Sequence, residues 1–149
     1  MATYYQVNVR FQKEDETGRL KTLNEAYLFD ALSYTEAEAK GYENIVTDAQ
    51  EFSINTITRM RLADLLQYPS GESWYKARLI FFSVDDKSGK EKKISNLVLV
   101  NADDFSQALD RIVESHKNML VPYEVTTLAL TPILDFYPYQ STDEDQAGE

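Results

Sequence analysis

The stretch Tyr27–Ile45, YLFDALSYTEAEAKGYENI, decides the fold because the chain repeats its pattern 71 positions later, at Val98–His116, VLVNADDFSQALDRIVESH. Both stretches open with an apolar run that is typical of a strand. Each run is followed by a helix N-cap with its capping-box partner, and these pairs are Ser33 with Glu36 and Asp104 with Gln107. Each copy therefore predicts a strand, a cap and a helix.

The segments around both copies predict further strands, because they alternate apolar and polar residues or are rich in β-branched residues. The predicted strands are Tyr4–Phe11, Arg19–Phe29 and Phe52–Met60, then Trp74–Val84, Ile94–Val100 and Tyr123–Leu130. At the shift of 71, Tyr75 and Phe82 match Tyr4 and Phe11, and Arg61–Leu66 is predicted as a single helical turn. The fold class is α+β. Tandem duplicated β-β-α-β units form a mostly antiparallel sheet, with two helices packed on one face and an acidic C-terminal tail.

We expect one domain over residues 1–139, made of repeats at about 4–66 and 74–131 with a linker at 67–73. The halves should pack around a pseudo-twofold axis. Residues 132–139 form an extended arm, because Pro132 and Pro138 are unsuited to a regular central strand. We expect a homodimer or larger oligomer, with the following arm residues buried at an inter-half or intersubunit contact: Leu134, Phe136 and Tyr137. Residues 140–149 are predicted to be a disordered tail.

Composition and motifs give no sign of catalysis. The chain lacks cysteine and has a single histidine, His116, at a predicted helix end. Neither a Gly-x-Ser-x-Gly elbow nor a phosphate-binding glycine loop occurs. We therefore expect no enzyme, no catalytic residue, no cofactor and no metal. No apolar run approaches the ~20 residues of a membrane helix, and the N-terminus does not resemble a signal peptide, so we expect a cytoplasmic protein that does not bind membranes.

The net charge of −10 opposes a purely electrostatic grip on nucleic acid. Four acidic residues crowd into the last seven positions, however, so the body up to Gln140 carries −6. Aromatic and basic residues stand together on the predicted strands, and bases stack on exposed aromatic rings while cations follow the phosphates. The candidate residues for binding nucleic acid or nucleotide are Tyr4, Arg10, Arg59, Arg61, Trp74, Lys76 and Arg78.

The faces of Trp74–Val84 can be separated by alternation. Tyr75, Ala77, Leu79 and Phe81 form the core face, whereas Trp74, Lys76, Arg78 and Ile80 form the other face. That second face is either a wet surface, an oligomer contact or a binding surface.

Nearly the whole chain, apart from its tail, resembles an uncharacterised family, a domain of unknown function found in Bacteroidota and their phages. The resemblance is carried by Tyr27-Leu28, Ala31-Leu32-Ser33, Thr35-Glu36-Ala37-Glu38, Trp74-Tyr75-Lys76, Lys90-Glu91-Lys92-Lys93 and Leu97–Val100. It implies a small intracellular protein of a phage or mobile element and brings no catalytic residues.

Three functions are compatible with these observations. The first is non-enzymatic binding of single-stranded nucleic acid through an aromatic and basic sheet face, with a tail that competes for that face or recruits partner proteins. The second is a counter-defence protein that sequesters a small nucleotide signal. The third is a protein–protein inhibitor whose acidic surface mimics nucleic acid.

Overall fold

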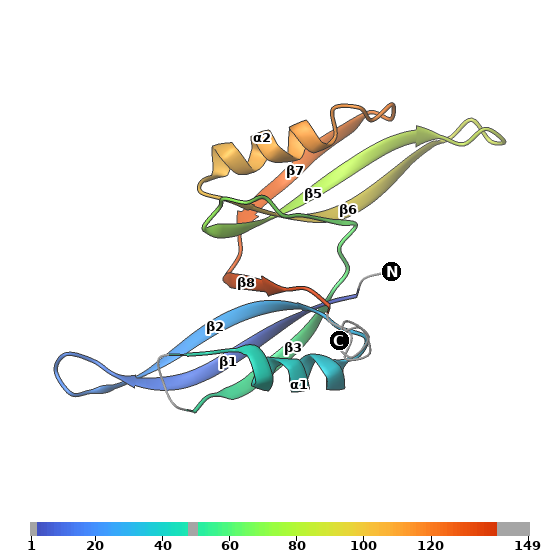
Figure 1. Ribbon diagram of the computed structural model, residues 1–149. Helices are drawn as coiled ribbons and strands as arrows, with labels where there is room; N and C mark the ends of the chain where they lie inside the picture. Colours follow the sequence, from blue (N-terminus) through green and yellow to red (C-terminus); the bar gives the residue numbers. More distant parts are fainter. Residues whose placement is uncertain (1–2, 48–50, 140–149) are drawn as a thin grey trace, which may run out of the picture. The chain divides into compact units, whose positions relative to one another are not determined.

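The computed structural model describes residues 3–47 and 51–139 (Figure 1). The predicted tail, 140–149, lies outside the described residues. Within the described part, the elements are β1 (Tyr4–Glu14), β2 (Leu20–Asp30), α1 (Tyr34–Asn44), β3 (Ser53–Met60), β4 (Asp64–Leu66), β5 (Ser73–Val84), β6 (Glu91–Ala102), α2 (Phe105–Ser115), β7 (Tyr123–Leu130) and β8 (Ile133–Tyr137). The α+β class and the duplicated β-β-α-β order are confirmed.

The chain divides into two compact units, each with its own four-stranded sheet. Unit 1 comprises Met1–Met60 with Ile133–Glu149, and unit 2 comprises Arg61–Pro132. The strand orders are β3-β1-β2-β8 in unit 1 and β4-β6-β5-β7 in unit 2. In both sheets the long strands pair antiparallel and one short edge strand pairs parallel. A single domain with pseudo-twofold packing stays a prediction.

The core of unit 1 lies between α1 and one face of its sheet. The alternation predicted for the first strand is confirmed, since Tyr5, Val7, Val9 and Phe11 are all buried. They are joined in or beside this core by Tyr27, Phe29, Ala31, Ala37 and Ile45. Polar residues alternate with the apolar ones on β1, so only one face of this strand is apolar.

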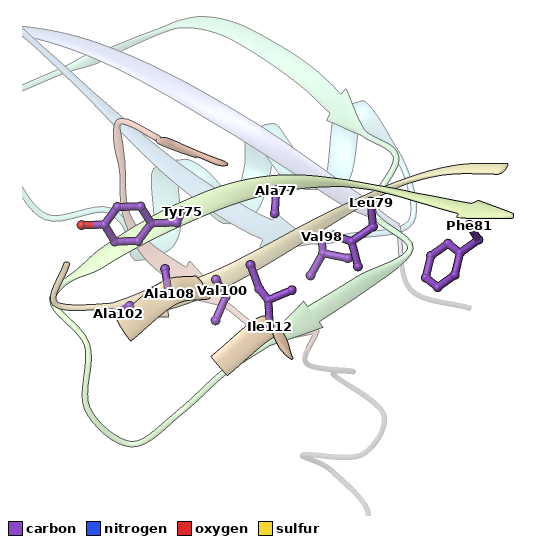
Figure 2. Close-up of a cluster of buried hydrophobic side chains, with 9 residues drawn as sticks. All are labelled: Tyr75, Ala77, Leu79, Phe81, Val98, Val100, Ala102, Ala108 and Ile112. Carbon is purple, nitrogen blue, oxygen red and sulfur yellow. The ribbon is translucent and has the colours of Figure 1, made fainter. Parts of the chain in front are cut away.

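The core of unit 2 has the same construction (Figure 2). Ala108 and Ile112 of α2 point toward Val98 and Val100 of β6, and Tyr75, Ala77, Leu79, Phe81 and Ala102 complete the cluster. The core face predicted for β5 is therefore confirmed. Phe105, Leu109 and Val113 of α2 are 40–51% exposed and lie outside this cluster.

Equivalent residues of the two units are 70 positions apart on the first long strand and 71 positions apart on the second. Buried Tyr5 and Tyr75, 70 positions apart, pair with Phe29 and Val100, which are 71 apart. The hairpin loops, 15–19 and 85–90, account for the difference, since the second is one residue longer. The predicted match of Tyr4 and Phe11 with Tyr75 and Phe82 is therefore wrong: a slip of one residue moves every side chain of a strand to the other face.

The fourth strand of each sheet comes from the other repeat. β4 follows β3 of unit 1 along the chain but pairs parallel with β6 of unit 2. Reciprocally, β8 follows β7 of unit 2 but pairs parallel with β2 of unit 1. Asp64-Leu65-Leu66 and Asp135-Phe136-Tyr137 are 71 positions apart, so the two strands are equivalent elements that the repeats exchange.

These strands correct two predictions. A strand replaces the helical turn expected in Arg61–Leu66, and β8 replaces the extended arm, because Pro132 and Pro138 flank the strand rather than interrupt it. Within the single chain Leu134 is 52% exposed and Phe136 and Tyr137 are half-buried, and burial of the three at an inter-half or intersubunit contact stays a prediction. Tyr137 stacks on Phe29 with ring centroids 4.7 Å apart.

A cation of the helix covers a tyrosine just beyond each exchanged strand. The Arg111 guanidinium lies 4.5 Å from the ring centroid of Tyr68, and Lys40 Nζ lies 4.2 Å from that of Tyr139. In unit 2 the Asn101 side chain also bonds the backbone of Tyr68, donating to its carbonyl (2.9 Å) and accepting from its N–H (2.7 Å). The buried amide is thereby satisfied, and the end of β4 is held to the unit that β4 joins.

Both predicted helix N-termini are confirmed. Ser33 Oγ accepts a hydrogen bond from the Glu36 N–H at 3.1 Å, and Asp104 Oδ1 accepts one from the Gln107 N–H at 2.7 Å. Glu36 and Gln107 each reach back to accept from the N–H of the residue before the cap. The helices consequently begin at equivalent positions, Tyr34 and Phe105.

The helices fill equivalent positions differently, which predicts that a larger residue destabilises one unit and a smaller residue destabilises the other. Gly41 corresponds to buried Ile112, and a Cβ at Gly41 would lie 3.1 Å from Ile54 Cδ1. Gly41→Ile should lower the free energy of unfolding by about 1–3 kcal/mol through overpacking. Ile112→Ala should lower it by about 2–5 kcal/mol through a cavity. Urea denaturation measures both, with exposed Glu38→Ala as the control. An unchanged Gly41→Ile midpoint would contradict the close helix contact.

The anchoring of β8 is tested by paired substitutions on that strand. Tyr137→Ala removes a half-buried ring that stacks on Phe29 and should lower the free energy of unfolding by about 2 kcal/mol. Leu134→Ala removes an exposed side chain and should change it little. Thermal and urea unfolding of both variants decide the matter, and equal losses would rule out this placement of the strand.

Candidate functional site

The face of the unit 2 sheet opposite α2 gathers cations beside an aromatic ring. The register puts Lys76, Arg78, Ile80 and Phe82 of β5 on one side, together with Lys93 and Ser95 of β6. These six residues are called the basic face. Lys76, Arg78 and Lys93 are exposed, whereas Ile80 and Phe82 are half-buried. The face therefore combines accessible charge with a partly accessible apolar centre.

Side-chain contacts arrange the basic face. Arg78 Nη1 donates a hydrogen bond to Ser95 Oγ at 2.8 Å. Lys93 Nζ lies 5.7 Å from the ring centroid of Phe82, its direct cross-strand partner. Glu91 and Glu124 share this side of the sheet, but Glu91 lies at the hairpin end and Glu124 on the edge strand. Cations therefore occupy the two central strands.

Trp74 does not supply the aromatic surface that the sequence led us to expect. Alternation places it on the same side as Lys76, but the residue is only 5% exposed. A base cannot stack on a buried ring, so Trp74 is not available to a ligand in this structure. Phe82 is the aromatic residue of this face, and it was missed. The sequence could have indicated Phe82, because it is the next residue in the alternation that places Trp74, Lys76, Arg78 and Ile80 on one face.

The predicted binding residues of unit 1 do not form one face. Tyr4 and Arg10 lie on the side of β1 that faces away from α1. Exposed Arg59 is in register with the core residue Tyr5, and therefore belongs to the opposite side. Tyr4 is half-buried and tilted against Phe136, with centroids 6.0 Å apart, while Arg10 Nε donates to Asn24 Oδ1 at 3.3 Å.

Arg61, the remaining candidate, is exposed and precedes β4 in unit 2. It lies outside the strands that form the basic face. Of the predicted set, the structure brings only Lys76 and Arg78 together on an accessible face with an aromatic ring.

Charge is divided unequally between the units. Residues 61–132 contain nine lysine and arginine residues against ten aspartate and glutamate residues, a net charge of −1. Residues 1–60 with 133–139 carry −5, and residues 140–149 carry −4. Most of the chain's negative charge is therefore outside unit 2, where the basic face lies, so that face is less opposed by its surroundings than the total of −10 suggests.

The aspartates at the two hairpin tips form hydrogen bonds within their own turns. Asp15 Oδ1 accepts from the N–H groups of Thr17 and Arg19, each at 2.9 Å, and the hydrogen bond from the Thr17 side chain is the main cause that lowers the pKa of Asp15. At the equivalent tip, Asp85 Oδ1 accepts from the Lys87 N–H at 3.0 Å. Among the described residues, no three potential metal ligands (histidine, cysteine, aspartate or glutamate) come together.

A hollow of about 470 Å³ lies beside the β1–β2 hairpin. Its lining is Lys13, Glu14, Asp15, Glu16, Thr17, Lys21 and Leu23. Three carboxylates against two ammonium groups disfavour an anionic nucleotide, so this hollow gives no support to sequestration of a nucleotide signal.

The phenol of Tyr27 carries the largest pKa shift described. Burial is the first cause that raises its pKa, followed by the hydrogen bond that it donates to Glu25 Oε1 at 3.0 Å. Burial raises the pKa of Tyr137 as well. A phenol with a raised pKa stays protonated at neutral pH and leaves no phenolate to accept a proton, so these shifts suit packing better than proton abstraction.

None of the helices in the described part of the chain is long and apolar enough to cross a membrane. Comparison with curated proteins and with solved structures finds no match to the chain. A family model described as a domain of unknown function does match, and it covers residues 3–139. The chain therefore belongs to the DUF4494 family.

Proposed function

We propose that this protein is a non-enzymatic binder of single-stranded nucleic acid, and that the basic face of unit 2 is its contact surface. The observation that carries the proposal is the shared exposure of Arg78 and Lys93 around Phe82. Cations that follow phosphates beside a ring that stacks on a base are the usual components of a surface that binds single strands without reading sequence.

The geometry of the sheet suits an extended ligand. Neighbouring strands lie ~4.8 Å apart, and side chains on one face recur every ~6.8 Å along a strand. Lys76, Arg78 and Phe82 follow one another along β5, and Lys93 stands beside Phe82 on β6. A single strand lying along β5 would therefore meet Lys76 and Arg78 before it reaches the ring, and Lys93 beside the ring. The family resemblance supports a role in a phage or mobile element, where replication exposes single strands.

The basic face predicts salt-dependent binding of a fluorescent oligo(dT), measured by anisotropy. Arg78→Ala with Lys93→Ala should weaken binding and reduce the slope of log K against log salt by about 1.4, since each phosphate contact on a single strand contributes ~0.7. The matched control is Lys21→Ala with Lys117→Ala, which removes the same charge away from this face. Absence of binding by the unaltered protein at low salt would refute the proposal, as would equal losses in the two double variants.

The ring of Phe82 should contribute to the affinity for nucleic acid independently of the charged residues. Phe82→Ala is expected to weaken oligo(dT) binding by about 1–3 kcal/mol while leaving the salt slope unchanged, because stacking releases no counterions. Phe52→Ala, in unit 1, is a matched loss of a half-buried phenylalanine. A thermal melt of each variant separates loss of binding from loss of folding.

The acidic C-terminal residues should oppose binding. Removal of residues 140–149 raises the net charge from −10 to −6 and should strengthen oligo(dT) binding, most of all at low salt where repulsion is least screened. Anisotropy titrations of the full and shortened chains at two salt concentrations test this. Weaker binding by the shortened chain would mean that these residues do not compete with the nucleic acid.

A further inference from the structure

Unit 2 has an open sheet edge beside an exposed apolar helix stripe. β7 is the last strand of its sheet, and no described strand pairs with its outer edge. Phe105, Leu109 and Val113, four residues apart on α2, are 51%, 40% and 47% exposed, and Leu130 at the end of β7 is 57% exposed. These four side chains are called the apolar edge.

Contacts made by α2 show that the stripe lies on the β7 side of the helix. Arg111 faces the opposite side, where it covers Tyr68 beyond β4. His116 lies against Tyr123 of β7, with ring centroids 5.4 Å apart. Leu130 is in register with Tyr75, and Phe105 meets the Tyr75 ring edge-on at 4.9 Å. The helix stripe and the strand edge therefore form one continuous surface.

Unit 1 shows that the fold does not require apolar residues there. At an offset of 71, the counterparts of the apolar edge are Tyr34, Glu38, Tyr42 and Arg59. Tyr42 uses its hydroxyl to accept a hydrogen bond from the N–H of Ile54 on the edge strand β3, at 3.3 Å. Val113 replaces this tyrosine in unit 2 and has no group that could bond to β7. Unit 1 thus protects its edge with polar side chains, whereas unit 2 presents an apolar, unguarded edge.

We infer that β7 and the apolar edge form the interface with a second copy of this chain. Two β7 strands pair antiparallel about a twofold axis, and the two α2 stripes pack together above the joined sheet. The eight-residue strand has no proline and one charge, Glu124, and an axis near Thr127 places the Glu124 residues of the two copies at opposite ends of the paired strands, away from one another. Unit 2 carries a charge of only −1, so it is where two copies of a −10 chain repel one another least.

This interface differs from the one that the sequence predicted around Leu134, Phe136 and Tyr137, and it does not depend on the proposed binding of nucleic acid. If both are correct, the joined sheet places the basic faces of two copies on one side. A dimer without oligonucleotide binding, or a monomer that binds it, would separate the two proposals.

The experiment gives unit 2 the residues of unit 1. Leu109→Glu with Leu130→Arg copies Glu38 and Arg59, which this fold already accommodates at equivalent exposed positions. Light scattering across a concentration series should give twice 17.1 kDa for the unaltered chain and 17.1 kDa for the double variant. Leu134→Glu, at an exposed position of β8, is the control and should remain dimeric. A monomeric unaltered chain overturns the inference, and so does a double variant that remains dimeric; a thermal melt confirms that this variant is folded.

A cross-link tests which strand lies at the axis. The chain has no cysteine, so a single introduced cysteine can form a disulfide only between copies. Under mild oxidation, Thr127→Cys on β7 should give a cross-linked dimer on a non-reducing gel. Thr56→Cys, its counterpart on β3, should remain monomeric. Preferential cross-linking through Thr56→Cys would overturn the assignment to β7.

Discussion

The lengths of two connections force the repeats to exchange strands. β2 and β3 both run antiparallel to β1 and therefore run in the same direction, which is also the direction of the fourth strand beside β2. A strand that followed β3 into its own sheet would need a parallel crossover of about a dozen residues. Only residues 61–63 separate β3 from β4, and only residues 131–132 separate β7 from β8. Each fourth strand therefore completes the sheet of the other repeat. The tyrosine just beyond the strand, Tyr68 or Tyr139, then lies against a cation of the helix in that unit.

Local patterns predict most of the elements but not this exchange. The alternation at Tyr5, Val7 and Val9 and the caps at Ser33 and Asp104 are contained in short stretches, so each could be identified without knowing the rest of the chain. β4 is only three residues long, too short for any periodicity to appear. Its assignment depends on a parallel partner more than 30 residues away, which no local pattern describes.

The candidate site was only partly predictable for a related reason. Alternation correctly put Trp74, Lys76 and Arg78 on one side of a strand, but the side of a strand does not determine how exposed each residue is. Trp74 is buried and Phe82 is partly accessible on the same strand face. Arg59 was grouped with Tyr4 from sequence, although register places it on the opposite side. The residue types and their alternation along the strand predicted which chemical groups this surface carries. Strand pairing and burial determine which of those residues lie together and are accessible.

The two repeats share one frame, meaning the same strand pairing and the same helix start, but they differ in the residues on their surfaces. Both have a bulge at the same place in the pairing of the first and third long strands, between Asn8 and Val9 and between Arg78 and Leu79. Both have a capped helix that begins at the same position. On that frame, unit 1 presents amides and hydroxyls such as Asn8 bonded to Thr56 (2.8 Å), whereas unit 2 presents Arg78 bonded to Ser95. Since one frame tolerates both sets, folding alone does not account for cations on one face of unit 2 and apolar residues along its edge; the two proposals assign these residues to contacts with nucleic acid and with a second copy of the chain.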